Sequence, residues 1–425
     1  MTSWDGERIE AIRHQPISPQ EKGFGGPLHS APTTAHALAE IAPAAGAGWL
    51  GSPRALIRHS ALRHNISTMA RYCADRGIEL YPHGKTTMAP QVVAAQVAAG
   101  ARGVTVATVT QARVFRAFGF TEILIANQVT DRGGASWLAE MAAVDQAFTV
   151  TCYVDSVAGV QLLDAAVAAG PTVRRLSVLV ELGHAEGRTG VRTFAEARAV
   201  AEAVAGSRGL RLVGVAGYEG SISRPTVDET LAAARDYCQL LGELTTELVS
   251  AGHLSGRPVI SAGGSAYFDA VVDVLATEAA WTLVLRSGCY VTHDHGLYRS
   301  VSPFERGSHD LTLRPALEVW APVISRPDRG TVVIGAGRRD VSFDAGLPVL
   351  LQATQAGAAV DVSGAEPRRL FDQHLVVSVP HDNGLRPGDE VQLGVSHPCT
   401  TFDKWRWLPV VDDEDRIVDV VRTHF

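Results

Sequence analysis

Lysine is scarce in this chain of 425 residues. Of its 38 basic side chains only Lys22, Lys85 and Lys404 are lysines, which leaves 35 arginines. An exposed cation can be of either type, but a residue that must lose its proton and bond to a carbonyl carbon cannot be arginine, whose pKa stays above about 12. Lys85 stands in LYPHGKTTMAP, between an apolar run and a helix-like stretch. We therefore treat it as a candidate for covalent chemistry, the alternative being a solvated loop lysine.

Several other features are missing, and each absence narrows the function. No apolar run approaches the ~20 residues that span a bilayer, and MTSWDGERIEAIRHQ lacks the apolar segment of a signal peptide. The net charge is −7, without a basic stripe that could bind nucleic acid. The five cysteines are scattered and odd in number, which indicates no disulfide framework: Cys73, Cys152, Cys238, Cys289 and Cys399. We expect a cytoplasmic protein that binds neither nucleic acid nor a membrane.

From about residue 53 the sequence alternates short β-branched runs with alanine-rich amphipathic runs that end in glycine. The candidate strands are IELYPH near 78, GVTVATV near 103, EILIANQV near 122, FTVTCYVD near 148, RLSVLVELG near 175, LRLVGVAGYEG near 210, PVISAGG near 258 and WTLVLRSGCY near 281. Apolar strands separated by helices are typical of parallel sheets covered on both faces. Eight such units predict an α/β fold with a (β/α)8 barrel, and an open doubly wound sheet is the alternative.

The pattern changes after about residue 305. LTLRPALEVWAPVIS, GTVVIGAG, HLVVSVP and DEVQLGVSHPC are strand-like, with turns at PDRG, DNG and RPGD and no long helical run. We therefore divide the chain into an N-terminal extension over residues 1–50, a barrel over 51–305 and a β-domain over 306–425. The extension is expected to pack on one of the two domains.

Two glycine-containing loops follow the seventh and eighth candidate strands, where barrels often bind phosphate. They read SAGGSAYF and RSGCY, and backbone N–H groups there could approach an anion closely. The candidate residues are Gly263, Gly264, Ser265, Ser287, Gly288, Cys289 and, beside them, Tyr290. Either glycine stretch alone is commonly just a tight turn. Two of them, together with Lys85 after the first strand, indicate a cofactor with a phosphate and an aldehyde, pyridoxal phosphate.

Further polar residues follow other strands. Arg188, after the fifth strand, could direct its guanidinium at the pyridine nitrogen of the cofactor, or could pair with Glu181 or Glu186. Tyr218, after the sixth strand, could contact the cofactor or pack inside the barrel. Asn127 and Gln128, at the end of the third strand, could also reach the pocket.

VSHPCTTFDKW places His397 and Cys399 two residues apart. On a strand, residues i and i+2 face the same side, and Pro398 between them favours an edge strand. Imidazole nitrogen and thiolate sulfur are preferred ligands of zinc. The pair is a candidate metal site, although such pairs are commonly unrelated and catalytic zinc usually has three protein ligands.

Together these residues resemble the fold-type III pyridoxal-phosphate enzymes, which have an alanine racemase-like fold, and within them the D-serine dehydratase and D-threonine aldolase family. The motifs are PHGKT (82–86), ELGHAEGRTGV (181–191), SAGGS (261–265), RSGCY (286–290) and SHPCTTFDKW (396–405). The resemblance implies that Lys85 holds the cofactor and that Arg188 faces the pyridine nitrogen. The metal pair is His-x-Cys in the dehydratases and His-x-Asp in the aldolases, so His397 and Cys399 side with the dehydratases. DQHLVV departs from the Glu-Glu-His segment of relatives, which leaves the role of His374 open.

The resemblance implies a β-elimination that converts a D-3-hydroxy amino acid to a 2-oxo acid and ammonia. Lys85 would remove the Cα proton, and a zinc ion on His397 and Cys399 would act as Lewis acid on the β-hydroxyl. Thiolate suits zinc, whereas carboxylates suit manganese or magnesium, so Cys399 favours elimination over aldol cleavage. Three alternatives stay open: a D-threonine aldolase, an amino acid racemase and a non-catalytic cofactor carrier. Relatives are homodimers, and we expect the same here.

Overall fold

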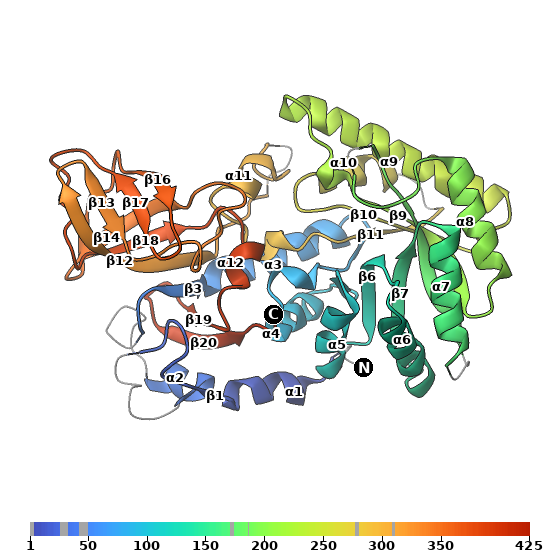
Figure 1. Ribbon diagram of the computed structural model, residues 1–425, viewed down its shortest axis with the longest axis horizontal. Coiled ribbons are helices and arrows are strands. Elements are labelled where there is room, and N and C mark those ends of the chain that lie inside the picture. The colour runs from blue at the N-terminus through green and yellow to red at the C-terminus, as the bar shows by residue number, and fades with distance from the viewer. Residues whose placement is uncertain are drawn as a thin grey trace. The chain divides into compact units, whose positions relative to one another are not determined.

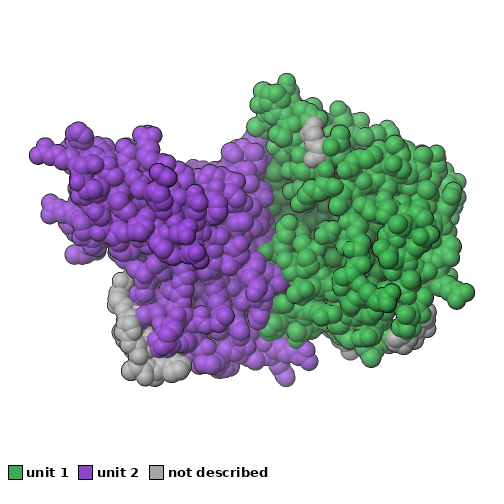
Figure 2. All heavy atoms as spheres, in the orientation of Figure 1, with its two compact units in different colours: residues 1–5, 70–85, 95–288 green, residues 6–69, 86–94, 289–425 purple. Residues whose placement is uncertain are grey.

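Residues 4–25, 33–41, 50–170, 174–185, 187–276, 280–307 and 311–425 are described by the computed structural model. Their contacts divide the chain into two units, which Figure 2 shows in different colours. Unit 1 consists of Met1–Asp5, Ala70–Lys85 and Ala95–Gly288, and unit 2 of Gly6–Met69, Thr86–Ala94 and Cys289–Phe425. The domain boundaries predicted at residues 50 and 305 rest on changes in the sequence pattern, whereas the two units are defined by contacts. The predicted boundaries therefore stay predictions.

Unit 1 is built on an 8-stranded parallel sheet whose strands follow one another in chain order. The strands are β4 (Glu79–Leu80), β5 (Val104–Val106), β6 (Glu122–Gln128), β7 (Thr149–Val154), β8 (Leu176–Leu182), β9 (Leu210–Gly217), β10 (Val259–Ala262) and β11 (Thr282–Leu285). β4 pairs with β11, and a bridge between His83 and Thr105 joins the β4 segment to β5. The sheet therefore closes on itself, which confirms the predicted barrel and all eight predicted strands.

Helices follow the barrel strands along the chain, and Figure 1 shows several of them on the outside of the sheet. They are α3 (His59–Ala74) and α4 (Pro90–Ala98), which cross the limits of the units, and α5 (Val109–Ala117), α6 (Arg132–Val144), α7 (Val157–Ala168), α8 (Phe194–Gly206), α9 (Val227–Ser250) and α10 (Phe268–Leu275). Short polar side chains begin α5 to α9, because their oxygens accept hydrogen bonds from the unpaired first-turn N–H groups. Thr193 and Thr226 do so in complete capping boxes with Glu196 and Glu229.

The barrel interior is apolar at mid-height. Every residue of β8 is buried, as expected for a strand covered on both faces. Leu124, Tyr153, Leu179 and Ala216 form a buried cluster contributed by neighbouring strands. Chemistry is therefore confined to the strand ends, where polar side chains replace this packing.

Unit 2 contains an antiparallel sheet in the order β15-β14-β18-β12-β13-β17-β16. Its strands are β12 (Leu317–Asp328), β13 (Thr331–Ile334), β14 (Val349–Gln355), β15 (Ala358–Val360), β16 (Glu366–Leu370), β17 (Leu375–Ser378) and β18 (Glu390–Gly394). Two further strands, β19 (Trp407–Val411) and β20 (Ile417–Arg422), pair with each other. The predicted C-terminal β-domain is confirmed, and its helices α11 (Leu297–Val301) and α12 (Cys399–Phe402) are short.

The N-terminal segment contributes to unit 2. β3 (Arg54–Arg58) pairs antiparallel with β12 and parallel with β19, so a strand from before the barrel completes the C-terminal sheet. The remaining N-terminal elements are α1 (Gly6–Ala11), β1 (Pro16–Ile17), β2 (Thr33–Thr34) and α2 (Ala35–Ile41), and α2 contacts β20. Within the part of the chain that the structure describes, no helix is both long and apolar enough to cross a membrane.

A buried carboxylate links β3 to the C-terminal strands. Glu318, in β12, is 4% exposed and lies 2.6 Å from Arg58 Nη2. It also accepts hydrogen bonds from the Trp320 indole N–H, at 3.0 Å, and from the Gln392 amide. Removing one partner of such a buried pair leaves the other charge without full compensation.

We therefore predict that Glu318→Ala lowers the free energy of unfolding by about 3–5 kcal/mol, measured by urea denaturation. Glu318→Gln keeps the side-chain shape and should cost less. Glu414→Ala is the control, because Glu414 pairs with Arg416 on the surface and exposed pairs contribute about 0–1 kcal/mol. A Glu318→Ala protein as stable as the control would contradict a stabilising role for the link.

Candidate functional sites in the two units

The predicted cofactor residues of unit 1 lie just beyond the carboxyl ends of barrel strands. Lys85 is in a 3-10 turn, η3 (Gly84–Thr86), after β4, Arg188 follows β8 and Tyr218 follows β9. The predicted loops at 263–265 and 287–288 follow β10 and β11. Parallel strands end at the same rim of a barrel, which is where barrel enzymes carry their active sites.

Lys85 is half-buried, and its amine makes no hydrogen bond or ion pair with the described residues. Its neighbour Gly84 is required by packing, because a Cβ there would lie 2.6 Å from Phe115 Cζ. Burial holds the pKa of His83 well below its usual range, and the charges of Lys85 and Arg286 lower it further. His83 is therefore neutral, and its Nδ1 is buried without a partner. The lysine thus follows a rigid, neutral segment.

Arg188 is exposed, and its guanidinium lies over the ring of Tyr218, 5.3 Å from the centroid. This is cation–π geometry. The alternative partner Glu181 instead accepts a hydrogen bond of 2.6 Å from the Gln128 amide. The other alternative, Glu186, lies outside the described residues.

Tyr218 is held at its backbone. Tyr237, in α9, accepts a hydrogen bond from the Tyr218 N–H at 3.2 Å and donates one to the Leu182 carbonyl at 2.5 Å. His184 lies on the ring of Tyr237, with a centroid separation of 5.5 Å, and its Nε2 is 2.9 Å from Ser221 Oγ. These residues line one small pocket together with Arg188. Asn127, in contrast, donates to the Ala107 carbonyl at 3.3 Å.

The loop after β10 binds an anion that the protein itself provides. The N–H groups of Gly263 and Gly264 donate to the carboxylate of Glu219, at 3.0 and 2.7 Å. Glu219 is fully buried in a 3-10 turn, η4 (Glu219–Ser221), directly after Tyr218. Gly263 has φ +90°, and a Cβ there would lie 2.4 Å from Leu285, so glycine is required on both counts. The predicted anion-binding character of this loop is thus present, and two of its donors face Glu219.

The two predicted phosphate loops contact each other. The Ser287 hydroxyl donates to the Gly264 carbonyl at 3.0 Å, and the Arg286 N–H donates to the Gly263 carbonyl at 3.1 Å. Arg286 is buried and donates to Ser261 Oγ and to the Gly217 carbonyl, at 2.8 and 2.6 Å. Ser265 and Gly288, which adjoin Gly264 and Ser287 in the sequence, are both buried. The sequence patterns indicated no role for Glu219 or Arg286, although Glu219 stands in LRLVGVAGYEG and Arg286 in RSGCY.

Unit 2 contains a cluster of possible metal donors formed by Cys289, His397 and Cys399. One donor atom from each residue lies within 4.8 Å of the others, and the Cys289 and Cys399 sulfurs are 3.3 Å apart. The expectation of an edge strand at His397 is wrong: β18 ends at Gly394, and Cys399 begins α12 with Pro398 at its N-cap. Pro398 adopts helical dihedral angles, so it starts a helix turn, in which its missing N–H costs nothing.

Neighbouring groups orient these donors. Asp344 lies 2.8 Å from His397 Nδ1 and accepts a hydrogen bond from the Thr400 hydroxyl at 2.6 Å. A carboxylate at Nδ1 fixes that nitrogen as the N–H, which leaves Nε2 for a metal. The Thr86 hydroxyl is 3.5 Å from the Cys399 sulfur and 3.8 Å from that of Cys289.

The pKa values of the three donor side chains are shifted in different directions. The hydrogen bond from Cys289 lowers the pKa of Cys399 well below its usual range, against the effect of burial. The same hydrogen bond, with burial, raises the pKa of Cys289. Burial alone would lower the pKa of His397, but Cys399 and Asp344 raise it to about 9. Cys399 is therefore the more acidic of the two thiols in the cluster.

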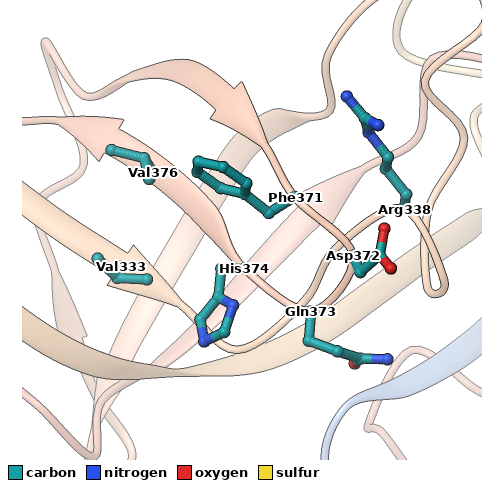
Figure 3. A pocket seen from close by; sticks show the side chains of 7 residues that line it. All are labelled: Val333, Arg338, Phe371, Asp372, Gln373, His374 and Val376. Carbon is teal, nitrogen blue, oxygen red and sulfur yellow. The ribbon is translucent and has the colours of Figure 1, made fainter.

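Three residues singled out in the sequence lie in less expected places. Cys289 and Tyr290 belong to a 3-10 turn, η5 (Cys289–Val291), and both are buried, with the Cys289 thiol directed at Cys399 rather than standing alone in a phosphate loop. His374 lines a shallow pocket on the β-domain with Phe371, Asp372 and Gln373, as Figure 3 shows. The residues lining that pocket all belong to unit 2.

We predict that Glu219→Gln weakens the loop after β10, because an amide presents one acceptor where the carboxylate presents two. The free energy of unfolding should fall by about 1–3 kcal/mol, and backbone amides over residues 261–268 should exchange hydrogen faster. Glu229→Gln is the control, because Glu229 is exposed and glutamine also completes a capping box. Equal exchange in the two variants would refute the role of Glu219.

Comparisons with known proteins agree with this geometry. The family described as "Alanine racemase, N-terminal domain" matches residues 57–281, which is more than half of the chain. The family described as "Putative serine dehydratase domain" matches residues 316–411. The two matches thus cover most of the barrel and most of the β-domain.

Curated relatives are 26–28% identical. D-threonine aldolase of an Arthrobacter species is 26% identical over 365 residues, covering 85% of this chain and 89% of its own. D-threo-3-hydroxyaspartate dehydratase of a Delftia species is 28% identical over 344 residues, covering 79% and 83%. The relatives therefore include both an aldolase and a dehydratase.

Solved structures share the fold. The crystal structure of D-threonine aldolase from Filomicrobium marinum superposes with a TM-score of 0.74, at 24% identity over 88% of this chain and 95% of that one. The Delftia dehydratase superposes with a TM-score of 0.70, at 24% identity over 88% and 98%. The predicted alanine racemase-like fold is thereby confirmed. The chain belongs to the alanine racemase N-terminal domain family and, as its motifs predicted, to the fold-type III pyridoxal-phosphate enzymes related to D-threonine aldolase and D-serine dehydratase.

Proposed function

We propose that the protein is a pyridoxal-phosphate- and metal-dependent dehydratase that converts a D-3-hydroxy amino acid to a 2-oxo acid and ammonia. The observation that carries the choice of reaction is the cluster of Cys289, His397 and Cys399, whose donors are sulfur and nitrogen. Soft donors of this kind favour zinc over manganese or magnesium. The proposal includes a homodimer and a cytoplasmic location.

The residues at the barrel rim fit the cofactor. Lys85 offers a half-buried amine that no described residue engages, and the loops after β10 and β11 contact each other at the same rim. The N–H groups of Gly263 and Gly264 bond Glu219, so the phosphate would be held by the other donors of these loops. We assign Lys85 to the aldehyde, Arg188 to the pyridine nitrogen and Tyr218 to the ring edge. The phosphate is assigned to the predicted loops that contain Gly263, Gly264, Ser265, Ser287 and Gly288, whereas Cys289 and Tyr290 lie in the following turn, η5. When bound, pyridoxal phosphate supplies an electron sink for the charge that develops at Cα.

Lys85 is also the proposed general base. With the cofactor bound, the Lys85 amine would be the group that accepts the Cα proton. The neighbouring imidazole of His83 is buried and neutral, and its lowered pKa makes it a poor competitor for that proton.

His397 and Cys399 are the proposed metal ligands. A divalent ion there supplies Lewis acidity for the departing β-hydroxyl, since hydroxide leaves poorly by itself. Asp344 keeps the His397 ring oriented through Nδ1, and the Thr86 hydroxyl lies 3.5 Å from the sulfur of Cys399. One solved structure is described as a cysteine-to-alanine variant of D-threo-3-hydroxyaspartate dehydratase in the metal-free form, and that description supports a metal site in this relative.

Aldol cleavage is the second candidate, because D-threonine aldolase matches 85% of the chain. That reaction breaks the Cα–Cβ bond and needs a group that removes the hydroxyl proton instead of expelling hydroxide. Racemisation would need a second base on the opposite face of the substrate. A cofactor carrier would have no use for a metal cluster.

The products distinguish these reactions. We expect purified protein to convert D-serine to pyruvate, or D-threonine to 2-oxobutyrate, with one ammonia per 2-oxo acid. Dialysis against a chelator should abolish turnover, and Zn²⁺ should restore it. D-threo-3-hydroxyaspartate belongs in the same panel because relatives are named for it. Glycine and acetaldehyde from D-threonine would instead establish the aldolase.

A separate prediction concerns the covalent bond to the cofactor. Purified protein should show an absorbance band near the short-wavelength edge of the visible range. The band should disappear when borohydride reduces the bond between Lys85 and the cofactor, and Lys85→Ala should lack it. Lys404→Ala is the matched control, because Lys404 pairs with Asp403 at 2.9 Å and should not affect the band. An unchanged band in Lys85→Ala would rule out the assigned attachment.

A further inference from the structure

We propose that Cys289 is a third protein ligand of the metal, so that the ion is held by two sulfurs and one imidazole. The pair predicted from the sequence was His397 and Cys399 alone, and Cys289 stood among the phosphate-loop candidates. The inference rests on the metal of the proposed function and extends it to the complete set of protein ligands.

The distances fit one ion. Two thiolates on a tetrahedral zinc, each at about 2.3 Å, lie roughly 3.8 Å from one another. The sulfurs of Cys289 and Cys399 are 3.3 Å apart, so a small separation of the two side chains admits the metal. All three donor atoms lie within 4.8 Å of one another. Both cysteines are free thiols, so a disulfide does not account for their approach.

Cys289 differs from the other buried cysteines. Cys73, Cys152 and Cys238 are free, buried thiols, as Cys289 is, so the difference lies in the groups near each sulfur. No other group of three or more His, Cys, Asp or Glu donors converges in the part of the chain that the structure describes. Cys289 alone among these four has a second thiol, an imidazole and a hydroxyl, that of Thr86, close to its sulfur.

The surroundings are those of a built metal site. Asp344 fixes the His397 tautomer, and Thr400 in turn fixes Asp344. Thr86 lies between the two sulfurs and can donate to a thiolate lone pair that the metal does not use. Second-sphere contacts of this kind are typical of metal sites, where they set ligand orientation.

A third ligand has a chemical consequence. Two cysteines and one histidine form a ligand set known for catalytic zinc, which leaves one position open in a tetrahedral site. Two thiolates also neutralise the charge of a divalent ion. The metal would therefore accept a single oxygen of the substrate, its 3-hydroxyl. The ligand set would prefer zinc to manganese or magnesium.

Cobalt substitution tests the ligand count without relying on turnover. Reduced, metal-free protein that retains its pyridoxal phosphate is titrated with Co²⁺ under argon, and the near-ultraviolet sulfur-to-cobalt absorbance is read as a difference spectrum. We expect Cys289→Ser to lose about half of that absorbance, because one of two thiolates is removed, and to bind Co²⁺ at least about tenfold more weakly. Cys238→Ser, a buried cysteine of α9 outside the cluster, should match the parent protein.

The outcomes separate the two levels of the proposal. If Cys289→Ser matches the parent in absorbance and affinity while Cys399→Ser and His397→Gln lose the metal, Cys289 is not a ligand and the proposed function stands. If the parent protein binds neither Co²⁺ nor Zn²⁺, metal dependence fails and this inference fails with it. Cys289→Ala, with circular dichroism of each metal-free variant, ensures that a loss of metal is not a loss of fold.

Discussion

The position of Lys85 depends on how a very short strand is fixed on both sides. β4 has two residues, yet the chain after it bonds to both neighbours in the barrel. The Tyr81 N–H donates to the Leu285 carbonyl at 2.9 Å, and the Thr105 N–H donates to the Pro82 carbonyl at 3.0 Å. The Thr105 hydroxyl adds a bond of 2.7 Å to the Tyr81 carbonyl. Because both edges are satisfied, the backbone that leads to the lysine is as constrained as a central strand.

The two units use negative charge in different ways. In unit 1 the carboxylate of Glu219 is enclosed by backbone N–H groups, so it shapes a loop and is unavailable to solvent. In unit 2 the half-buried sulfur of Cys399, whose pKa is lowered by the hydrogen bond from Cys289, lies beside the imidazole of His397 and the hydroxyl of Thr86. A buried anion that is fully satisfied stabilises structure, whereas a partly satisfied one attracts a cation. This contrast separates a positioning role from a ligand role.

The sequence predicts the barrel well because its signal is local: apolar runs of strand length alternate with capped helices, and each can be recognised alone. β3 escaped prediction because five residues of mixed polarity, RALIR, become a strand only when β12 and β19 lie beside them. The thiol pair escaped for the same reason, since 110 positions separate Cys289 from Cys399. The edge strand expected at His397 failed because Pro398 can begin a helix as readily as it can interrupt a strand.

The scarcity of lysine gains a physical explanation from the three that remain. Lys22 pairs with Asp340 at 2.7 Å and lies 3.9 Å above the ring of Trp405, and Lys404 pairs with Asp403 at 2.9 Å. Those contacts need only a positive charge, which arginine supplies equally well or better. Lys85 has no such partner among the described residues, and it alone lies at the barrel rim after the first strand. Arginine could replace Lys22 and Lys404 without loss of charge, whereas the proposed attachment of the cofactor at position 85 requires an amine that can lose its proton.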